Sequence, residues 1–366
     1  MGSMQENAEV ILGPFDVALE EPVYFKALVN EDGKTIKSLD MINGFVHRGM
    51  EALVMKRNFL QNLIITEKVC ALCSNNHPFT YCMAVEEIAN IRVPLRAQYL
   101  RVIADEIKRV ASHLFNLGML AHLVHDHKLM THILETREYF QDIKEYIWGN
   151  RMDLSANTIG GVKYNLDDEK IQFIYKNMDK AEEQIQRIIA FFENDTKLHK
   201  RIKGVGVLPH VDALRLGVVG PVARASGINN DIRKLSPYAA YGKLGFNVVL
   251  REDGDVYSRA MVRLYETLES IKLIELSIEN LPIGNIVFPT KPLIPEGETV
   301  TRSEAPRGEL MYYLKTNGGK SPQRMKWRVP TYLNWEALKV MMKDNSIDDI
   351  ALIFNSIDPC ISCTER

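Results

Sequence analysis

Two cysteine pairs at opposite ends of the chain constrain its fold more than any other sequence feature. Four of the five cysteines form these pairs, Cys70/Cys73 and Cys360/Cys363, each with the spacing Cys-x-x-Cys. This spacing lets both sulfurs of a pair face one ion across a tight turn, and thiolates suit zinc, iron–sulfur clusters or nickel. If the pairs share one metal, the fold must bring both ends of the chain together.

The composition is that of a soluble globular protein with a substantial core. The chain has 366 residues, of which 46% are hydrophobic and 25% charged. A formal net charge of −2 gives no electrostatic footprint for nucleic acid, so we expect no nucleic-acid partner. There is neither a long apolar stretch that would span a bilayer nor a secretory signal. We therefore expect a cytoplasmic location, where paired cysteines are more often ligands than disulfides.

The apolar pattern predicts a mainly α-helical chain. An alternating pattern around the turn Asn30-Glu31-Asp32-Gly33 predicts a β-hairpin. Elsewhere, apolar residues recur every three to four positions, which is typical of packed helices. This spacing predicts helices that begin near residue 47 and cover about 94–132, 167–193, 253–280 and 334–342.

We expect these elements to form a long-helix bundle with a small N-terminal β-sheet. Residues 1–45 would be the β-rich part and residues 46–366 the helical body. The intervals between the helices contain no linker that would separate independent units. Residues 1–366 are therefore expected to form a single domain.

The cysteines alone leave three kinds of metal site open: a zinc site, an iron–sulfur cluster and a nickel site. Four cysteines in two pairs most often make a structural zinc site, but such pairs are usually close in sequence and stabilise small folds. The runs of closely spaced cysteines that bind an iron–sulfur cluster are absent, and Cys82 lies too far along to complete one. We expect Cys82 to be a small buried hydrophobic residue.

The residues around both pairs narrow the choice. The first pair lies in Glu-Lys-Val-Cys-Ala-Leu-Cys-Ser-Asn-Asn-His-Pro (67–78) and the second in Asp-Pro-Cys-Ile-Ser-Cys-Thr-Glu-Arg (358–366). Both segments resemble the nickel-binding motifs of the large subunit of [NiFe]-hydrogenases, in particular the energy-converting, membrane-associated branch. Further matching segments occur in the same order along nearly the whole chain: His-Arg-Gly-Met-Glu (47–51), Gly-Gly-Val (160–162), Gly-Pro-Val-Ala-Arg-Ala-Ser-Gly (220–227) and Glu-Ala-Pro-Arg-Gly (304–308).

The resemblance implies a binuclear metal site and a reaction. Cys70 and Cys360 would be terminal nickel ligands, and Cys73 and Cys363 would bridge nickel to an iron that carries carbon monoxide and cyanide. The hydrogenase large-subunit fold and the reversible conversion of dihydrogen into protons and electrons are also implied. Soft thiolate ligands agree with nickel.

The resemblance also implies roles for side chains around the metal. Glu21 would exchange protons with the terminal thiolate, Arg307 would hang over the open metal position, and Thr331 would donate to a cyanide. His77 would hydrogen-bond a bridging sulfur, and Asp358 could orient Arg307. Four of these residues have an ordinary alternative: Glu21 as a surface glutamate, Arg307 as a surface salt-bridge partner, His77 as a core histidine bonded to a carbonyl, and Asp358 as a turn cap.

The C-terminal residue departs from the family pattern. Better-studied relatives hold magnesium between a glutamate, equivalent to Glu51, and a C-terminal histidine, but Arg366 occupies the histidine position here. We hypothesise that the Arg366 guanidinium pairs with Glu51 and replaces the magnesium ion, because a charge-assisted pair can link the same two segments.

The expected partners follow from the electron path. No further cysteine set for a cluster exists in this chain, so an iron–sulfur small subunit would have to carry the electrons. The resemblance implies membrane subunits that translocate ions, a ferredoxin-like electron carrier reached through the partner subunits, and a peripheral position on the cytoplasmic face of the membrane.

Two other interpretations remain open. The quinone-site subunit of respiratory complex I shares the Gly-Gly-Val and Arg-Ala-Ser-Gly segments, but its members lack the four-cysteine set. A zinc-stabilised scaffold without catalytic activity is the second alternative.

Overall fold

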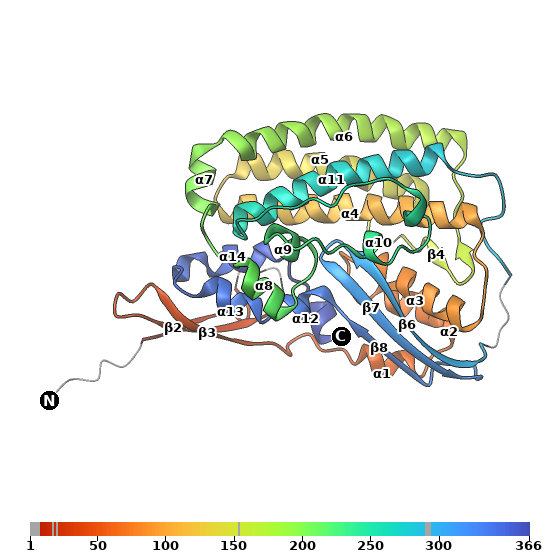
Figure 1. Ribbon diagram of the computed structural model, residues 1–366, viewed down its shortest axis with the longest axis horizontal. Coiled ribbons are helices and arrows are strands. Elements are labelled where there is room, and N and C mark those ends of the chain that lie inside the picture. Colours follow the sequence, from red (N-terminus) through yellow and green to blue (C-terminus); the bar gives the residue numbers. More distant parts are fainter. Residues whose placement is uncertain (1–7, 17, 20, 153, 290–293) are drawn as a thin grey trace.

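The computed structural model describes residues 8–366 except 17, 20, 153 and 290–293. Its largest part is a bundle of four long helices, which Figure 1 shows stacked along one side of the molecule. The helices are α4 (Leu95–Leu123), α5 (His127–Trp148), α6 (Asp168–Asn194) and α11 (Val256–Glu279). Helix α4 packs against α5 and α11, and α6 packs against the same two helices. The predicted long-helix bundle is confirmed.

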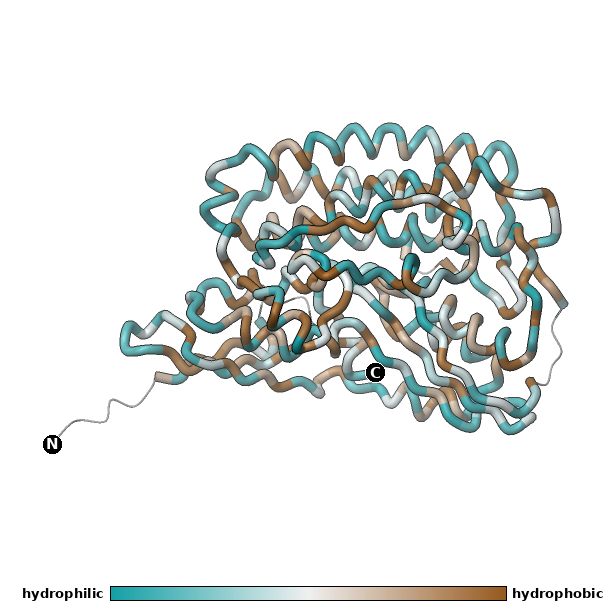
Figure 2. Tube along the Cα trace, viewed as in Figure 1, coloured by the Kyte–Doolittle hydropathy of each residue, from teal (hydrophilic) through white to brown (hydrophobic). Residues whose placement is uncertain are grey.

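The bundle core follows the apolar stripes of the sequence. In α4 the buried stripe consists of residues at helical spacing: Leu100, Ile103, Ile107, Val110, Leu114 and Leu117. Helix α6 buries only one face, and Figure 2 shows hydrophilic residues along much of its length. The outer helix is thus amphipathic, whereas α4 is buried on most sides.

The helix expected over 94–132 is wrong at its C-terminal end. Helix α4 ends at Leu123, and α5 begins at His127 after a reversal in which His125 adopts a positive φ of 62°. The Asp126 side chain accepts the N–H of Leu129 and caps the new helix. Apolar residues continue at helical spacing through this break, so the pattern did not locate it.

The predicted N-terminal sheet is confirmed. It consists of β1 (Glu9–Leu12), β2 (Tyr24–Val29) and β3 (Ile36–Ile42), which pair antiparallel in that order. Alternate residues of β2 are buried, and Phe25 packs edge-to-face on Phe354 at a ring-centroid distance of 5.0 Å. The strands thereby join the N-terminal part to the C-terminal helices.

A second antiparallel sheet was not predicted. It contains β6 (Glu296–Ala305), β7 (Gly308–Asn317) and β8 (Arg324–Arg328), and helix α3 (Asn76–Ile88) packs on β6 and β7. Figure 1 shows this sheet below the bundle, so the two parts face each other across the middle of the molecule. The cysteines belong to the buried cluster that this sheet forms with the first helices.

Short elements complete the chain. The helix expected from residue 47 is two helices, α1 and α2, and the helix expected over 334–342 is broken between α12 and α13. The short elements are α1 (Met50–Val54), α2 (Phe59–Glu67), β4 (Asn157–Thr158), β5 (Gly161–Val162), α7 (Thr196–Ile202), α8 (His210–Leu216), α9 (Gly220–Ala225), α10 (Ile232–Leu235), η1 (Tyr241–Lys243), α12 (Pro330–Asn334), α13 (Ala337–Met342), η2 (Ile347–Asp349), α14 (Ile350–Ser356) and α15 (Ile361–Glu365).

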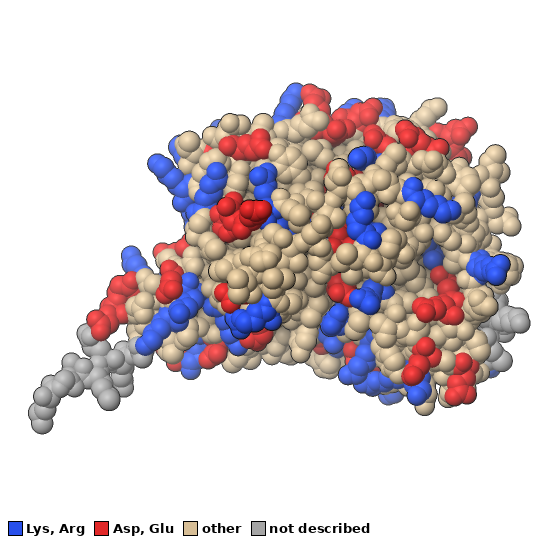
Figure 3. All heavy atoms as spheres, viewed as in Figure 1, with Lys and Arg blue, Asp and Glu red and all other residues tan. Residues whose placement is uncertain are grey.

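The surface carries mixed charge. On the face in Figure 3, acidic and basic side chains are interspersed, in keeping with the formal net charge of −2. Among the helices that the structure describes, none has the length and apolar character needed to cross a bilayer.

Candidate metal centre

Hydrogen bonds fasten the C-terminal segment to residues from the first fifth of the chain. Glu365 accepts the backbone N–H groups of Gly44 and Val46. Arg48 donates to the carbonyl of Val69 at 2.7 Å and to that of Ser362 at 3.2 Å. These contacts hold the segment that carries the second cysteine pair beside the segment that carries the first.

The four cysteines meet in the interior. Each is 3% exposed. The Sγ atoms of Cys70, Cys360 and Cys363 lie within 4.8 Å of one another, and those of Cys70 and Cys360 are 3.2 Å apart. Cys73 adjoins them, since its backbone N–H donates to the Cys70 sulfur at 3.1 Å and its own thiol neighbours Cys363. A disulfide needs sulfurs about 2.05 Å apart, and all four thiols are free.

A buried arginine lies directly against this group. Arg307, in the tight turn between β6 and β7, donates from one Nη to the Cys73 sulfur at 3.2 Å and to the Ser112 hydroxyl at 3.3 Å. Its other Nη and its Nε bond the Asp358 carboxylate at 2.5 Å and the Asp358 carbonyl at 2.7 Å. The predicted pairing of Asp358 with Arg307 is therefore present, and it fixes the cation next to the sulfurs.

His77 and Thr331 contact the second cysteine pair. The Nε2 atom of His77 lies 3.4 Å from the Cys363 sulfur, and its Nδ1 lies 2.7 Å from the Tyr312 hydroxyl. Burial lowers the pKa of His77 to about 4, so the ring is neutral. With its proton on Nε2, the ring donates to the sulfur and accepts from Tyr312. The Thr331 hydroxyl accepts the N–H of Cys360 at 3.1 Å.

Glu21 lies at the start of the C-terminal helix. Its carboxylate accepts the backbone N–H groups of Ile361 and Ser362 and the Ser362 hydroxyl. Glu21 is thus partly buried and fastened next to Cys360, and it is not a free surface glutamate. Its negative charge is close enough to influence the Cys360 thiol.

The thiols differ in acidity. Hydrogen bonds from the thiols of Cys363 and Cys70, with help from the positive charge of Arg307, lower the pKa of Cys360 to about 6 against the opposing effects of burial and Glu21. Burial raises the pKa of Cys363 well above its ordinary value. Cys360 is thus more acidic than Cys363 and Cys73 before any metal binds.

The donor set fits a soft metal ion. The cation and the neutral imidazole N–H aimed at sulfur favour thiolate over thiol at the four convergent cysteines. Nothing in this set offers the ring of oxygen ligands that magnesium or calcium prefers. The residues therefore suit nickel or another thiophilic metal, which Cys70, Cys73, Cys360 and Cys363 could hold.

The proposed substitute for magnesium is also in place as an ion pair. The Nε atom of Arg366 lies 3.0 Å from Oε1 of Glu51, and the Lys326 ammonium lies 4.0 Å from Oε2 of the same carboxylate. Figure 1 places the C-terminus beside α1, the helix that carries Glu51.

The structure brings together every residue singled out from the sequence for this site. Sequence reasoning missed Tyr312, Ser112 and Lys108, whose ammonium donates to the Ala71 carbonyl between the first two cysteines. Tyr312 lies on the unpredicted sheet, and the other two lie among the buried residues of α4. No motif marks any of them.

A buried group of four thiols, drawn from distant parts of a helical-bundle chain, is the kind of site that thiolate-ligated metalloproteins have. Comparison with known proteins shows to which family this chain belongs. Residues 48–125 match the family model "Nickel-dependent hydrogenase", and residues 126–294 and 287–366 match "Respiratory-chain NADH dehydrogenase, 49 Kd subunit".

Individual relatives cover the full chain. The chain is 54% identical over 97% of its length to the carbon monoxide-induced hydrogenase of Rhodospirillum rubrum, covering 98% of that protein. It is 36% identical over its full length to the membrane-bound hydrogenase subunit alpha of Pyrococcus furiosus, covering 89% of it. A chain of the membrane-bound sulfane sulfur reductase, an archaeal respiratory membrane complex, has the same fold, with a TM-score of 0.93, 26% identity and full coverage of both chains.

This chain therefore belongs to the family that unites nickel-dependent hydrogenases with the 49-kDa subunits of respiratory NADH dehydrogenases. The resemblance inferred from its motifs is confirmed.

Proposed function

We propose that this chain is the catalytic subunit of an energy-converting [NiFe]-hydrogenase, which reversibly oxidises dihydrogen to protons and electrons. The observation that carries the proposal is the convergence of four buried thiols from both ends of the chain beside Arg307. The names of two full-length relatives, a carbon monoxide-induced and a membrane-bound hydrogenase, support it.

Cys70 and Cys360 would be terminal nickel ligands, and Cys73 and Cys363 would also bind an iron that carries carbon monoxide and cyanide. When bound, such a centre supplies the redox chemistry that interconverts dihydrogen with protons and electrons. The protein supplies a buried site that excludes water, since every ligand is almost fully covered.

The surrounding side chains handle charge and protons. The Arg307 guanidinium, fixed by Asp358, places a permanent positive charge where negative charge gathers on the sulfurs. His77 orients and stabilises the Cys363 sulfur through its N–H. Thr331 fixes the backbone at Cys360 and retains a hydroxyl hydrogen that can donate to a cyanide. Glu21 is next to Cys360 and accepts the proton that the Cys360 sulfur releases.

Partner subunits complete the proposal. An iron–sulfur subunit carries electrons to or from a ferredoxin-like carrier, and ion-translocating membrane subunits hold the complex at the cytoplasmic face of the membrane. The membrane complexes named among the relatives support this arrangement. Residues 1–366 act in it as a single domain, because the shared site ties both ends together.

Infrared spectroscopy of the purified complex is the decisive measurement. Bands from metal-bound carbon monoxide and cyanide, together with nickel and iron near unit stoichiometry, are expected. Zinc without these bands would indicate a scaffold. No metal at all would indicate a subunit of the complex I type, which the match to the 49-kDa family model favours as the second candidate.

The variant Cys360→Ser tests the assignment of the terminal ligand. Serine is a hard and weakly acidic ligand, so we expect hydrogen turnover to be lost while the fold, measured by circular dichroism, is retained. The matched control is Cys82→Ser, which changes the fifth cysteine, buried on α3 away from the thiol group. The control should keep its nickel. Full activity of Cys360→Ser would contradict the proposal.

A further inference from the structure

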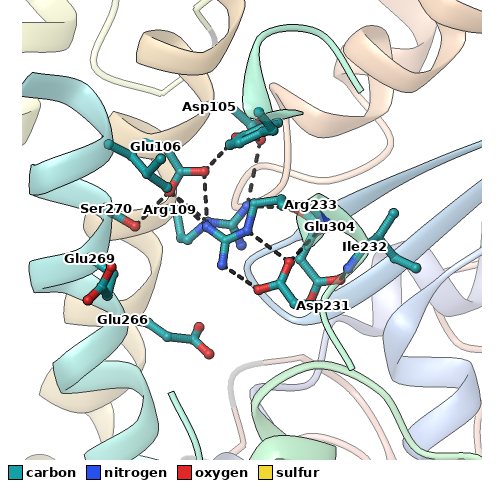
Figure 4. Close-up of polar contacts among 12 residues, drawn as sticks. Asp105, Glu106, Arg109, Asp231, Ile232, Arg233, Glu266, Glu269, Ser270 and Glu304 are labelled. Atoms are coloured by element: carbon teal, nitrogen blue, oxygen red, sulfur yellow. Dashed lines mark hydrogen bonds and ion pairs between the residues drawn. The ribbon is translucent and has the colours of Figure 1, made fainter. Parts of the chain in front are cut away.

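A second buried cluster of ionisable groups lies between the bundle and the sheet (Figure 4). It contains five carboxyl groups and three guanidinium groups, and each residue is at most 3% exposed. The members are Asp105, Glu106, Asp231, Glu266, Glu304, Arg109, Arg224 and Arg233. They come from α4, α9, α11, β6 and the segment around α10.

Each guanidinium serves more than one carboxyl group. Arg224 bonds Glu266 at 2.6 Å and Glu304 at 2.8 Å. Arg233 bonds Asp231 at 2.6 Å and Glu106 at 3.1 Å. Figure 4 shows the Arg109 and Arg233 side chains side by side among these carboxyl groups.

Arg109, the third guanidinium group, lies closer to one of its two carboxyl neighbours than to the other. Its Nε lies 3.0 Å from Glu106, whereas its Nη is 3.6 Å from Asp105. Among the five carboxyl groups, Asp105 therefore has the longest contact to its nearest guanidinium partner. It is thus the carboxyl group most able to hold a proton.

The charges of this cluster do not balance. Five carboxyl groups against three guanidinium groups leave two negative charges in excess, and His113, which contacts Glu266 at 3.1 Å, is neutral because burial lowers its pKa to about 4. Arg263 and the pair Arg307–Asp358 adjoin the cluster. Including them gives five guanidinium groups against six carboxyl groups, still one negative charge in excess. A buried, uncompensated carboxylate takes up a proton.

The hydroxyl of Tyr241 indicates where a proton lies. It contacts two carboxyl oxygens, Oε1 of Glu106 at 2.5 Å and Oδ2 of Asp105 at 3.1 Å. A phenol has one hydrogen, so it can donate to only one of them. With that hydrogen on the shorter contact to Glu106, the phenol oxygen faces Asp105 Oδ2 with a lone pair. That contact is then a hydrogen bond only if Oδ2 carries the proton.

The other oxygen of Asp105, Oδ1, already accepts two hydrogen bonds and is therefore not the oxygen that carries the proton. Oδ1 accepts the side-chain amides of Asn75 at 3.0 Å and of Asn76 at 2.7 Å. Both amides donate, which leaves Oδ2 as the site of protonation.

We propose that this cluster is a proton-binding site in which Asp105 Oδ2 carries an exchangeable proton at neutral pH and donates it to the Tyr241 oxygen. Release breaks the O–H bond of Asp105 and passes the proton to solvent, and uptake reverses this, with no change of oxidation state.

The electrostatics agree with the geometry. Burial and the negative charge of Glu106, opposed by the positive charge of Arg109, raise the pKa of Asp105 to about 7. Burial and Asp231 likewise raise the pKa of Glu304 to about 7. Asp105 and Glu304 are thus the two carboxyl groups of the cluster whose pKa is raised, whereas the pKa values of Glu106, Asp231 and Glu266 are lowered. The titratable and charged groups around Asp105 are Glu106 and Arg109 on α4, Arg233 on α10, Tyr238 and Tyr241 before and in η1, Glu266 on α11 and Glu304 on β6.

The proton lies close to the cysteines without touching them. Asn75 and Asn76 directly follow Cys73-Ser74 and connect that segment to Asp105. Loss of the proton would therefore add a negative charge one side chain away from the first cysteine pair. The inference concerns the protein's own side chains and holds whichever metal the cysteines bind.

Infrared difference spectroscopy of the purified full-length protein during a pH titration tests the proposal without any substitution. A protonated carboxyl group has its own C=O stretching band. We expect such a band to shift when aspartate is labelled with ¹³C and to lose its amplitude with a midpoint near pH 7. Absence of a band sensitive to the aspartate label at pH 6 would overturn the proposal.

Three variants add a directional test. Asp105→Asn keeps the shape and should abolish the labelled band, while the control Glu86→Gln, which removes a buried carboxylate paired one-to-one with Arg101 at 2.6 Å, should leave it. Tyr241→Phe removes the acceptor of the proton, so the midpoint should move to lower pH. A midpoint that moves to higher pH would mean that Tyr241 donates to an ionised Asp105, and it would overturn the proposal.

Discussion

At the residue scale, Glu21 combines a structural and a chemical role. Its carboxylate accepts three hydrogen bonds from the two residues that follow Cys360. It therefore holds the end of the chain in place while lying where a proton from the Cys360 sulfur can be received. The two roles are separable, because only the second needs a group that ionises.

The variant Glu21→Gln separates them. Glutamine keeps an acceptor oxygen for the backbone N–H groups but cannot exchange a proton, so we expect hydrogen turnover to fall by about 100-fold or more. Metal content and infrared bands should be unchanged. The same substitution at the exposed Glu31 is the control, and it should have no effect. Near-normal turnover of Glu21→Gln would show that protons leave by another route.

Lys144 on α5 gives a pH-dependent prediction. It is 1% exposed, and burial, followed by repulsion from Lys108, lowers its pKa to about 6 from an ordinary 10.5. Between these values the unfolded chain binds a proton that the folded chain does not, so stability rises with pH. Lys144→Met removes this proton uptake. The variant should be more stable than the parent by about 2–4 kcal/mol at pH 7, with a gain that shrinks toward pH 10.

Chemical denaturation at several pH values measures that gain. Lys128→Met, at an exposed position of the same helix, is the control and should show no such pH dependence. A constant difference across the range would mean that Lys144 stays charged in the folded protein.

Sequence reasoning found the residues that carry motifs and missed those that packing assembles. The cysteines, Arg307, Asp358, Thr331 and His77 stand in recognisable segments. Of the buried cluster, only Arg224 and Glu304 lie in such segments. The other members carry no motif, because the sequence pattern of a charged residue on α4 is the same whether its face contacts water or another charged group. Only the fold shows that Arg109, for example, is fully covered.

At the element scale, the position of Arg307 depends on a close contact between two backbones. The turn from β6 to β7 packs against the start of α9, where Gly220 has a φ of 69°. A Cβ on Gly220 would lie 2.2 Å from the Arg307 carbonyl oxygen. The glycine is required because no side chain fits between the two elements.

Gly220→Ala should therefore displace the turn that holds Arg307. We expect the free energy of unfolding to fall by at least about 2 kcal/mol more than for Gly217→Ala. Gly217 has a similar φ of 64° but nothing within 4 Å of its Cβ position, so it isolates the backbone strain from the collision. Equal losses in the two variants would contradict the role of this contact.

Elements with one clearly apolar face were predictable from the sequence, whereas elements whose burial depends on a distant segment were not. Helices α6 and α11 follow from apolar residues at helical spacing, and Asp167 and Asp255 cap them. The sheet of β6, β7 and β8 escaped prediction although alternate residues of β7 are buried. The helix that covers it, α3, comes from a distant segment of the chain, and single-sequence patterns do not reveal such a partner.

At the scale of the whole molecule, the two ends of the chain form one unit. Arg366 and Glu51 are each about one-fifth exposed, and their ion pair joins the last residue to α1. We propose that the Arg366 guanidinium takes the place of the magnesium ion that the resemblance to [NiFe]-hydrogenases implies at Glu51.

A double-mutant cycle with Arg366→Ala and Glu51→Gln should give a coupling free energy of about 0.5–1 kcal/mol, typical of a partly exposed pair. The unfolding temperature of the parent chain should not respond to added magnesium. Magnesium-dependent stabilisation that disappears in Glu51→Gln would show that the ion, and not Arg366, is the native partner.

The distance along the chain between the two cysteine pairs also determines the order in which they are synthesised and can meet. Cys70 and Cys360 are separated by 290 positions. The early pair therefore leaves the ribosome long before its counterpart exists, and it must remain reduced and unclaimed by other metals during that interval. The group of four thiols can therefore form only after synthesis has passed Cys363, and the first two thiols have to stay available until then.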